Sequence, residues 1–129
     1  MSVTIQKAAL VLSLASVARG CTILAPCEDV EKPAIALIIL DSATQGPLAS
    51  DSIIVVAVDG PYTDSTRFSN SRPDPVTHLQ LARERPGLYD IRISAAGYRT
   101  WAQNDIRVRG GRCHVNTVDV TALLQRTPS

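Results

Sequence analysis

The chain is poor in aromatic rings, in histidine and in net charge, and each shortage excludes a class of function. Its 129 residues include one Trp, three Tyr and one Phe, too few and too scattered for a platform that stacks bases or sugars. Two histidines fall short of the three or four ligands of a zinc site. With 13 basic and 12 acidic residues, the chain lacks the basic excess of a nucleic-acid-binding protein, and we predict no nucleic-acid partner.

Motifs of catalysis and metal binding are also missing. Neither G-x-S-x-G nor H-E-x-x-H occurs, so nothing indicates a serine hydrolase or a zinc protease. A site combining His78, His114 and Cys113 would conflict with a disulfide at that cysteine. Without a D-x-D-x-D-G loop, aspartates at strand ends such as Asp41 and Asp59 are expected to cap turns rather than to bind calcium. We therefore predict no enzymatic activity, no metal and no cofactor.

Apolar runs long enough to span a bilayer are absent. The run over residues 8–18 has about eleven mainly apolar residues, and a spanning helix needs ~20. Lys7 precedes this run, and the small residues Ala18 and Gly20 stand at −3 and −1 of a cut before Cys21. This order is typical of an export signal, here residues 1–20, rather than of a buried amino-terminal helix.

The segment Ala18-Arg19-Gly20-Cys21 resembles the lipobox of bacterial lipoproteins, although such boxes usually carry Leu at −3 and a small residue at −2. The resemblance implies a diacylglycerol on Cys21 and a lipid anchor in the membrane, with plain secretion as the alternative. The residue after the cysteine is Thr22 and not an aspartate. In the lipoprotein pattern this implies an outer-membrane lipoprotein that faces the periplasm or the cell surface. Residues 21–33 then form a polar, lipidated tether.

Three cysteines are an odd number for an exported protein. If Cys21 is acylated, Cys27 and Cys113 remain to form a disulfide that ties the start of the domain to its last strand. Chain entropy assigns such a bridge roughly 4–5 kcal/mol. A Cys21–Cys27 bridge is the alternative, and it would consume the lipid site.

Strand-like runs and turn signals alternate about every ten residues through residues 34–124, which is the pattern of a single all-β sandwich. The β-branched run 53–59 predicts a central strand covered on both faces, and the polar run 62–68 predicts an edge strand. The expected strands are 34–40, 53–59, 62–68, 76–82, 88–95, 98–108 (irregular at 103–105) and 112–123 (bulged near 116–117), with a two-residue hairpin turn at Gly110-Gly111 and a tail at 125–129.

Two segments resemble the signatures of carboxypeptidase regulatory-like domains. Residues 38–49 (IILDSATQGPLA) look like their opening D-x-x-T-G-x-P-L, with the glycine one position late, and residues 86–98 (PGLYDIRISAAGY) look like their strand closed by A-x-G-Y. The resemblance implies a seven-stranded antiparallel sandwich, Ig-like or transthyretin-like, with Tyr98 in the core or at a corner. Transthyretin-like hydrolases end in Tyr-Arg-Gly-Ser, which this chain lacks, so their activity is not expected.

The exposed strand faces offer one candidate surface. Arg92, Arg107 and Arg109 are expected to point away from the apolar sides of their strands, toward acidic polysaccharide, lipid head groups or a protein partner, or simply into solvent. Trp101 is expected to be half-buried. We predict a non-catalytic cell-envelope module that acts structurally or binds an envelope protein, with carbohydrate binding as the alternative.

Overall fold

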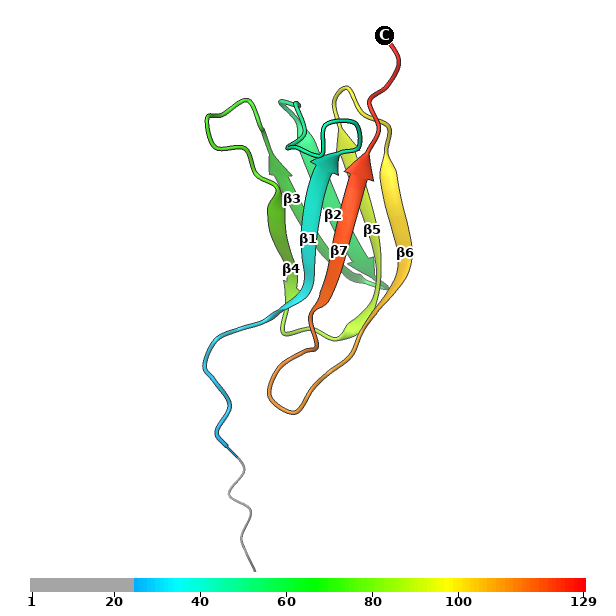
Figure 1. Ribbon diagram of the computed structural model, residues 1–129. Helices are drawn as coiled ribbons and strands as arrows, with labels where there is room; N and C mark the ends of the chain where they lie inside the picture. Colours follow the sequence, from blue (N-terminus) through cyan, green and yellow to red (C-terminus); the bar gives the residue numbers. More distant parts are fainter. Residues whose placement is uncertain (1–24) are drawn as a thin grey trace, which may run out of the picture.

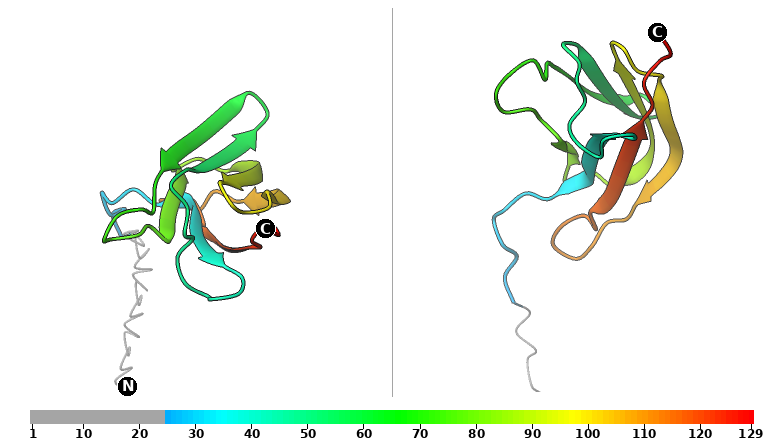
Figure 2. Two further views of the ribbon diagram at one scale, coloured as in Figure 1. Left: turned by 90° about the horizontal axis from the view of Figure 1, so that it is seen from above. Right: turned by 45° about the horizontal axis from the view of Figure 1, so that its top comes forward.

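Residues 25–129 are described by the computed structural model, and they form two β-sheets packed face to face (Figures 1 and 2). One sheet has the order β4-β1-β7 and contains β1 (Pro33–Asp41), β4 (His78–Arg83) and β7 (Val118–Leu124). The other has the order β3-β2-β5-β6 and contains β2 (Ile53–Asp59), β3 (Tyr62–Phe68), β5 (Gly87–Ala95) and β6 (Trp101–Val108). The predicted all-β sandwich is confirmed, and β3 is an edge strand as expected.

The core forms where the period-two apolar positions of both sheets meet. In β5, for example, Tyr89, Ile91 and Ile93 are buried whereas Asp90 and Arg92 are exposed. Tyr98 is also buried in this core, at the end of the sandwich where β5 finishes. In the described part of the chain, no helix is long and apolar enough to cross a membrane.

The expectation of purely antiparallel sheets is wrong for one pair of strands. β1 runs antiparallel to β4 but parallel to β7, from Ile35 beside Val118 to Asp41 beside Leu124. A parallel pair is allowed here because β7 follows β6, which lies in the other sheet, so no tight turn forces it to reverse.

Two further expectations about faces and boundaries need correction. β2 is central, between β3 and β5, but only its Ile53, Val55 and Ala57 face is buried, and the alternate residues stay partly exposed. The predicted strand 112–123 begins only at Val118. Residues 109–117 form a loop closed by the Gly110–Val115 bridge, so neither a two-residue hairpin nor a bulge near 116–117 is present.

The predicted irregularity in the sixth strand is confirmed. The β5–β6 register shifts between Tyr89 and Ile91, opposite residues 103–106. Asp105 has a φ of 59°, and its amide donates to the Asp90 carboxylate at 3.0 Å. An extra residue in one strand of an antiparallel pair produces this local kink.

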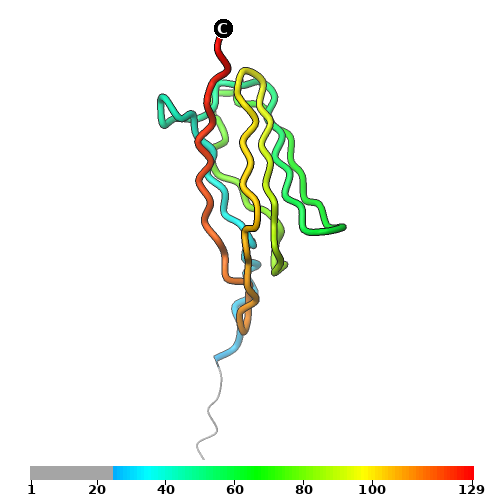
Figure 3. Tube along the Cα trace, turned by 90° about the vertical axis from the view of Figure 1, so that its right-hand side faces the viewer, coloured from blue at the N-terminus to red at the C-terminus, as the bar shows by residue number. Residues whose placement is uncertain are grey.

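The two ends of the sandwich differ in what they hold. We call the end where β1 begins the basal end; it carries the tether, the turns 59–62 and 83–87, and the loop 109–117 (Figures 1 and 3). The apical end carries the remaining connections and the carboxyl terminus. Residues 125–129, expected to be a tail, are fixed there in part, because Tyr98 pairs with Arg126 and the Thr127 amide donates to the Gly97 carbonyl.

Candidate functional site at the tether end

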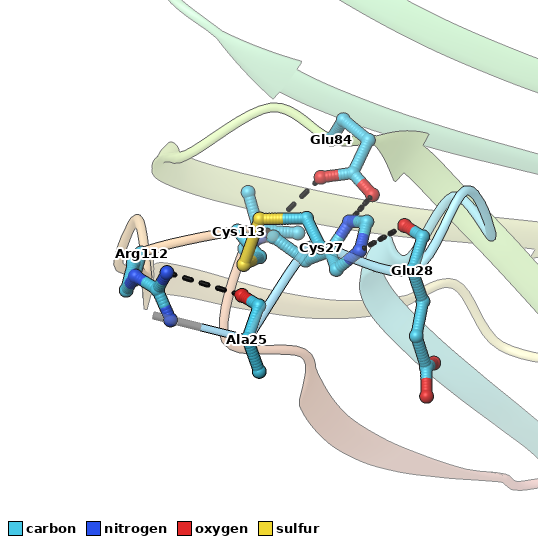
Figure 4. Close-up of a disulfide and its surroundings, with 8 residues drawn as sticks. Ala25, Cys27, Glu28, Glu84, Arg112 and Cys113 are labelled. Atoms are coloured by element: carbon cyan, nitrogen blue, oxygen red, sulfur yellow. Dashed lines mark hydrogen bonds and ion pairs between the residues drawn. A yellow bond between two sulfur atoms is a disulfide. The ribbon is translucent and has the colours of Figure 1, made fainter. Parts of the chain in front are cut away.

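The Cys27–Cys113 disulfide joins the tether to the basal loop 109–117 (Figure 4). The two Cα atoms lie 5.3 Å apart, and the bridge links positions separated by 86 residues. Cys27 and Cys113 are both exposed at the surface. The predicted pairing is confirmed, although Cys113 lies in a loop rather than on the expected strand.

Glu84 gathers three segments of the chain in the turn between β4 and β5. Its Oε1 accepts hydrogen bonds from the Lys32 amide of the tether and from His114 Nδ1 of the basal loop, both at 2.6 Å. Its Oε2 faces the Val115 amide at 3.4 Å. The Lys32 hydrogen bond contributes most, followed in the same direction by His114, to holding the pKa of Glu84 below its ordinary value.

His114 connects Glu84 with the tether through its second ring nitrogen. Nε2 lies 2.8 Å from the Glu28 carbonyl oxygen, while Nδ1 faces the Glu84 carboxylate. The two contacts use both nitrogens of the ring, one toward the turn between β4 and β5 and one toward the tether. The imidazole is therefore a bridge between the tether and the body of the domain.

Three more contacts hold residues of the tether along their length. Arg112 Nη2 donates to the Ala25 carbonyl at 3.1 Å, as Figure 4 shows, and Thr117 Oγ1 donates to the Pro33 carbonyl at 2.7 Å. An exposed ion pair joins Arg83 to Glu31 at 3.5 Å. The described tether is thus attached from residue 25 onward, whereas Cys21 lies outside the described residues.

The three predicted patch arginines are exposed but do not form one compact cluster. Arg92 lies opposite Ala102, and Arg107 lies opposite Leu88, four positions before Arg92 in β5. At ~3.4 Å per residue this separation along the strands is about 14 Å, and Asp90 lies between them. Arg109 follows the end of β6 and belongs, with Arg107, to the basal part of the molecule.

The outer face of the four-stranded sheet contains a shallow depression of about 350 Å³ near Arg92. Val56, Val58 and Ala102 supply its apolar surface, and Asp90 and Asn104 supply polar groups. None of the five aromatic rings lines it: Tyr89 and Tyr98 are buried, and Tyr62, Phe68 and Trp101 pack against the core. The half-buried position expected for Trp101 is confirmed.

A second polar network lies at the apical end, around the fully buried Asp41. Its Oδ1 accepts from the amides of Ala43 and Thr44, which confirms the predicted turn-capping role. Its Oδ2 accepts from Arg126 Nε at 2.7 Å and from the Tyr98 hydroxyl at 2.8 Å. Arg126 first, and then Tyr98, hold the pKa of Asp41 far below its ordinary value. These contacts join the end of β1 to the turn that follows it, to Tyr98 and to Arg126.

The side chains that could ligate a metal ion are dispersed over the described range 25–129. No group of three His, Cys, Asp or Glu residues there is placed to hold a metal ion. Asp59 pairs with Arg85 at 2.7 Å, and Asp64 accepts from the Ala82 amide at 2.8 Å. These carboxylates serve as internal hydrogen-bond acceptors in the fold.

The contacts of Glu84 and His114 at the basal end were not predicted from the sequence. Their partners come from the tether, a turn and a loop that are distant in sequence, so no local pattern predicts them. No family model matches the chain, and neither a curated protein nor a solved structure matches it.

Proposed function

We propose that this chain is a non-catalytic cell-envelope module, anchored to the membrane through a lipid on Cys21, with a structural or protein-interaction role. The observation that carries the proposal is the Cys27–Cys113 disulfide. It accounts for two of the three cysteines and leaves Cys21 alone, directly after the export-like segment 1–20. A disulfide is also expected of a protein in an oxidising compartment.

The contacts of the tether support an anchoring role. A lipid on Cys21 would be followed at once by a segment that is covalently and non-covalently attached to the domain from Ala25 and Cys27 onward. Such a module is held close to the membrane in a restricted orientation, whereas a long flexible linker would let it reorient freely. A restricted orientation suits a protein that presents a surface to an envelope partner.

The fold that we propose in finer detail is that of carboxypeptidase regulatory-like domains. Asp41 from the first resembling segment and Tyr98 from the second are hydrogen-bonded to each other, which supports a shared role for the two signatures. The parallel β1–β7 pair departs from the purely antiparallel sandwich that the resemblance implies. A fold of this kind carries no specific function by itself.

Carbohydrate binding is the weaker alternative, and we do not adopt it. Sugar-binding sandwiches present aromatic rings to the ligand, whereas all five rings of this chain are buried or packed against the core. A glycan array in which the purified protein binds one defined sugar class would reverse this preference.

Mass spectrometry of the purified protein tests the anchor directly. The expected mass corresponds to a chain beginning at an acylated Cys21, with Cys27 and Cys113 two hydrogens lighter than as thiols. A Cys21→Ala variant should leave the membrane fraction, while Thr22→Ala, which keeps the cysteine, should remain. A Cys21→Ala protein that stays membrane-bound would refute the anchor, and capture of a defined envelope protein by cross-linking would support the interaction role.

The same lipoprotein resemblance makes a prediction about sorting. In the lipoprotein pattern, an aspartate directly after the lipidated cysteine marks a protein that stays in the inner membrane. This chain has Thr22 at that position, so Thr22→Asp should retain the protein in the inner membrane. Unchanged outer-membrane fractionation of Thr22→Asp would contradict the proposed location, without affecting the question of acylation.

A further inference from the structure

We propose that the basal arginines Arg107, Arg109 and Arg112 contact the anionic head groups of the bilayer in which Cys21 is anchored. This proposal rests on the proposed function, because it requires the domain to be held at a membrane by its amino-terminal end. It assigns a binding surface and a ligand class, the phosphate groups of a lipid bilayer, to one end of the sandwich.

Covalent geometry places these arginines near the anchor. Ala25 is held by Arg112, and Cys27 is bonded to Cys113, so residues 25–27 lie against the basal loop. Ala25 follows Cys21 by four positions, a length of chain that spans no more than about 14 Å. The apical end lies roughly 30 Å further away, the length of β1, so only the basal end lies within reach of the bilayer surface.

The charge of the basal loop and of the end of β6 that leads into it fits an anionic surface. Residues 107–118 (RVRGGRCHVNTV) contain three arginines and one histidine and no acidic residue. Arg107, Arg109 and Arg112 are exposed, and within residues 25–129 none of them forms an ion pair with a carboxylate. The guanidinium groups of Arg107 and Arg109 are thus available for phosphate oxygens, which they can bind with two parallel donors. Arg112 uses one Nη2 donor for the Ala25 carbonyl and keeps its other donors for the same purpose.

Nearby acidic residues set the scale of the contact. Glu31 is paired with Arg83, and Glu84 with His114. The acidic residues that oppose the arginines are exposed and form no ion pair within residues 25–129: Glu28, Asp29, Asp105 and Asp119. Each arginine near an anionic leaflet contributes about a fivefold gain in the bound-to-free ratio, and this gain falls off within a Debye length of about 8 Å. The contact is therefore expected to orient an anchored domain rather than to recruit a free one.

Glycine amides report on this orientation by NMR. The processed protein, or protein coupled through its Cys21 thiol to a maleimide lipid, is placed in nanodiscs that contain a head-group spin label. Gly110 and Gly111 lie in the basal loop and Gly97 lies at the apical end, so their amide broadening compares the two ends. Nanodiscs with phosphatidylglycerol are compared with purely zwitterionic ones, each at low and high salt.

A matched pair of variants separates a local contact from overall charge. R107Q/R109Q/R112Q removes the basal arginines, and R67Q/R72Q/R99Q removes three exposed arginines toward the apical end with the same change in net charge. We expect several-fold stronger broadening of Gly110 and Gly111 in anionic nanodiscs, lost in the basal variant and at high salt but kept in the apical variant. The side chain of Arg109 has no hydrogen-bond partner within residues 25–129, so the single variant Arg109→Gln should leave the loop intact. It should lower the bound-to-free ratio of the basal end about fivefold.

Several outcomes would overturn the contact. The first is equal broadening in anionic and zwitterionic nanodiscs, and the second is an equal loss of broadening in both triple variants. The third is a Cys21→Ser protein that binds alginate through the basal arginines, together with broadening in nanodiscs that does not depend on the lipid. The last result would assign the arginines to acidic polysaccharide. Because the maleimide lipid supplies an anchor, a missing acyl group on Cys21 would refute the proposed function without deciding this measurement.

Discussion

The Tyr98 hydroxyl donates a hydrogen bond to the Asp41 carboxylate at 2.8 Å, across 57 positions of the chain. The same hydroxyl accepts from the Ala49 amide at 3.0 Å, and Arg126 completes the carboxylate's partners. One buried phenol thus joins the end of β1, the loop that follows it and the corner after β5. Burial is the main reason why the pKa of Tyr98 is raised, so the group stays protonated as a donor.

Replacing this phenol by a phenyl ring should destabilise the domain measurably. Tyr98→Phe leaves the Ala49 amide without its partner and removes one hydrogen bond to Asp41, a loss of about 1–3 kcal/mol. At ~4–8 °C for each kcal/mol, the melting temperature should fall clearly in calorimetry. Tyr62→Phe is the control, since no hydrogen bond of the Tyr62 hydroxyl is present in the described range, and it should change the melting temperature little. Equal effects of both substitutions would contradict the role of Tyr98.

Loss of the disulfide should produce the largest single change in stability. Cys113→Ser frees a closed loop of 86 positions and should lower the free energy of unfolding by roughly 4–5 kcal/mol, measured by urea titration. Cys21→Ser, which leaves the bridge intact, serves as the control. A Cys113→Ser protein with an unchanged unfolding midpoint would show that the Cys27–Cys113 disulfide does not stabilise the fold.

Acid should weaken the domain through Asp41 and Glu84. Both carboxyls have a pKa below their ordinary values of 3.8 and 4.5 in the folded state, so the unfolded chain binds more protons on acidification. Their contribution is complete above the ordinary pKa and is lost as the pH falls through the folded values, from about pH 5 downward. Urea unfolding at a series of pH values measures this slope.

Glu84→Gln isolates one of the two groups. This substitution should flatten the acid limb of the stability profile, because Glu84 no longer titrates. Glu31→Gln is the matched control, since both side chains of its ion pair with Arg83 are 63% exposed and screened by solvent. Identical pH slopes in the two variants would argue against a lowered pKa at Glu84.

Gly87 marks a close approach between two basal turns. A Cβ at this position would collide with Asp59 Oδ2, which Arg85 holds at 2.7 Å. We expect Gly87→Ala to cost about 1–3 kcal/mol by overpacking and by displacing this pair. At Gly46 a Cβ would meet only Thr44 Oγ1 at an ordinary 3.5 Å, so Gly46→Ala should be close to neutral in the same denaturation assay.

Strand positions were predictable because alternating burial leaves a direct trace in the sequence. In β5, Tyr89, Ile91 and Ile93 face the core, and the expected bounds differ from the observed ones by a single residue. The direction of β7 relative to β1 left no such trace, since a strand's own residues do not specify the orientation of a distant neighbour. The strand expected from residue 112, with a bulge near 116–117, begins only at Val118 because nothing local distinguishes an extended loop from a strand.

Of the candidate site, only the disulfide could be predicted from the sequence, because it follows from the number and positions of the cysteines. An odd count with Cys21 set apart indicated the Cys27–Cys113 pair, which is present. The convergence of Glu84, His114 and the Lys32 amide depends on three segments that meet only after folding. From the sequence alone, a glutamate in a turn is indistinguishable from any other solvent-exposed carboxylate.

The position of the disulfide also determines how the domain bears mechanical load. Strands β1 to β6 lie within the covalent ring closed by Cys27 and Cys113, and only β7 lies outside it. A pull between a point ahead of Cys27 and the carboxyl end therefore passes through the sulfur atoms and directly into residues 113–129. Their full extension adds at most about 60 Å, so tension on the amino-terminal end cannot unravel the remaining six strands while the bridge is oxidised.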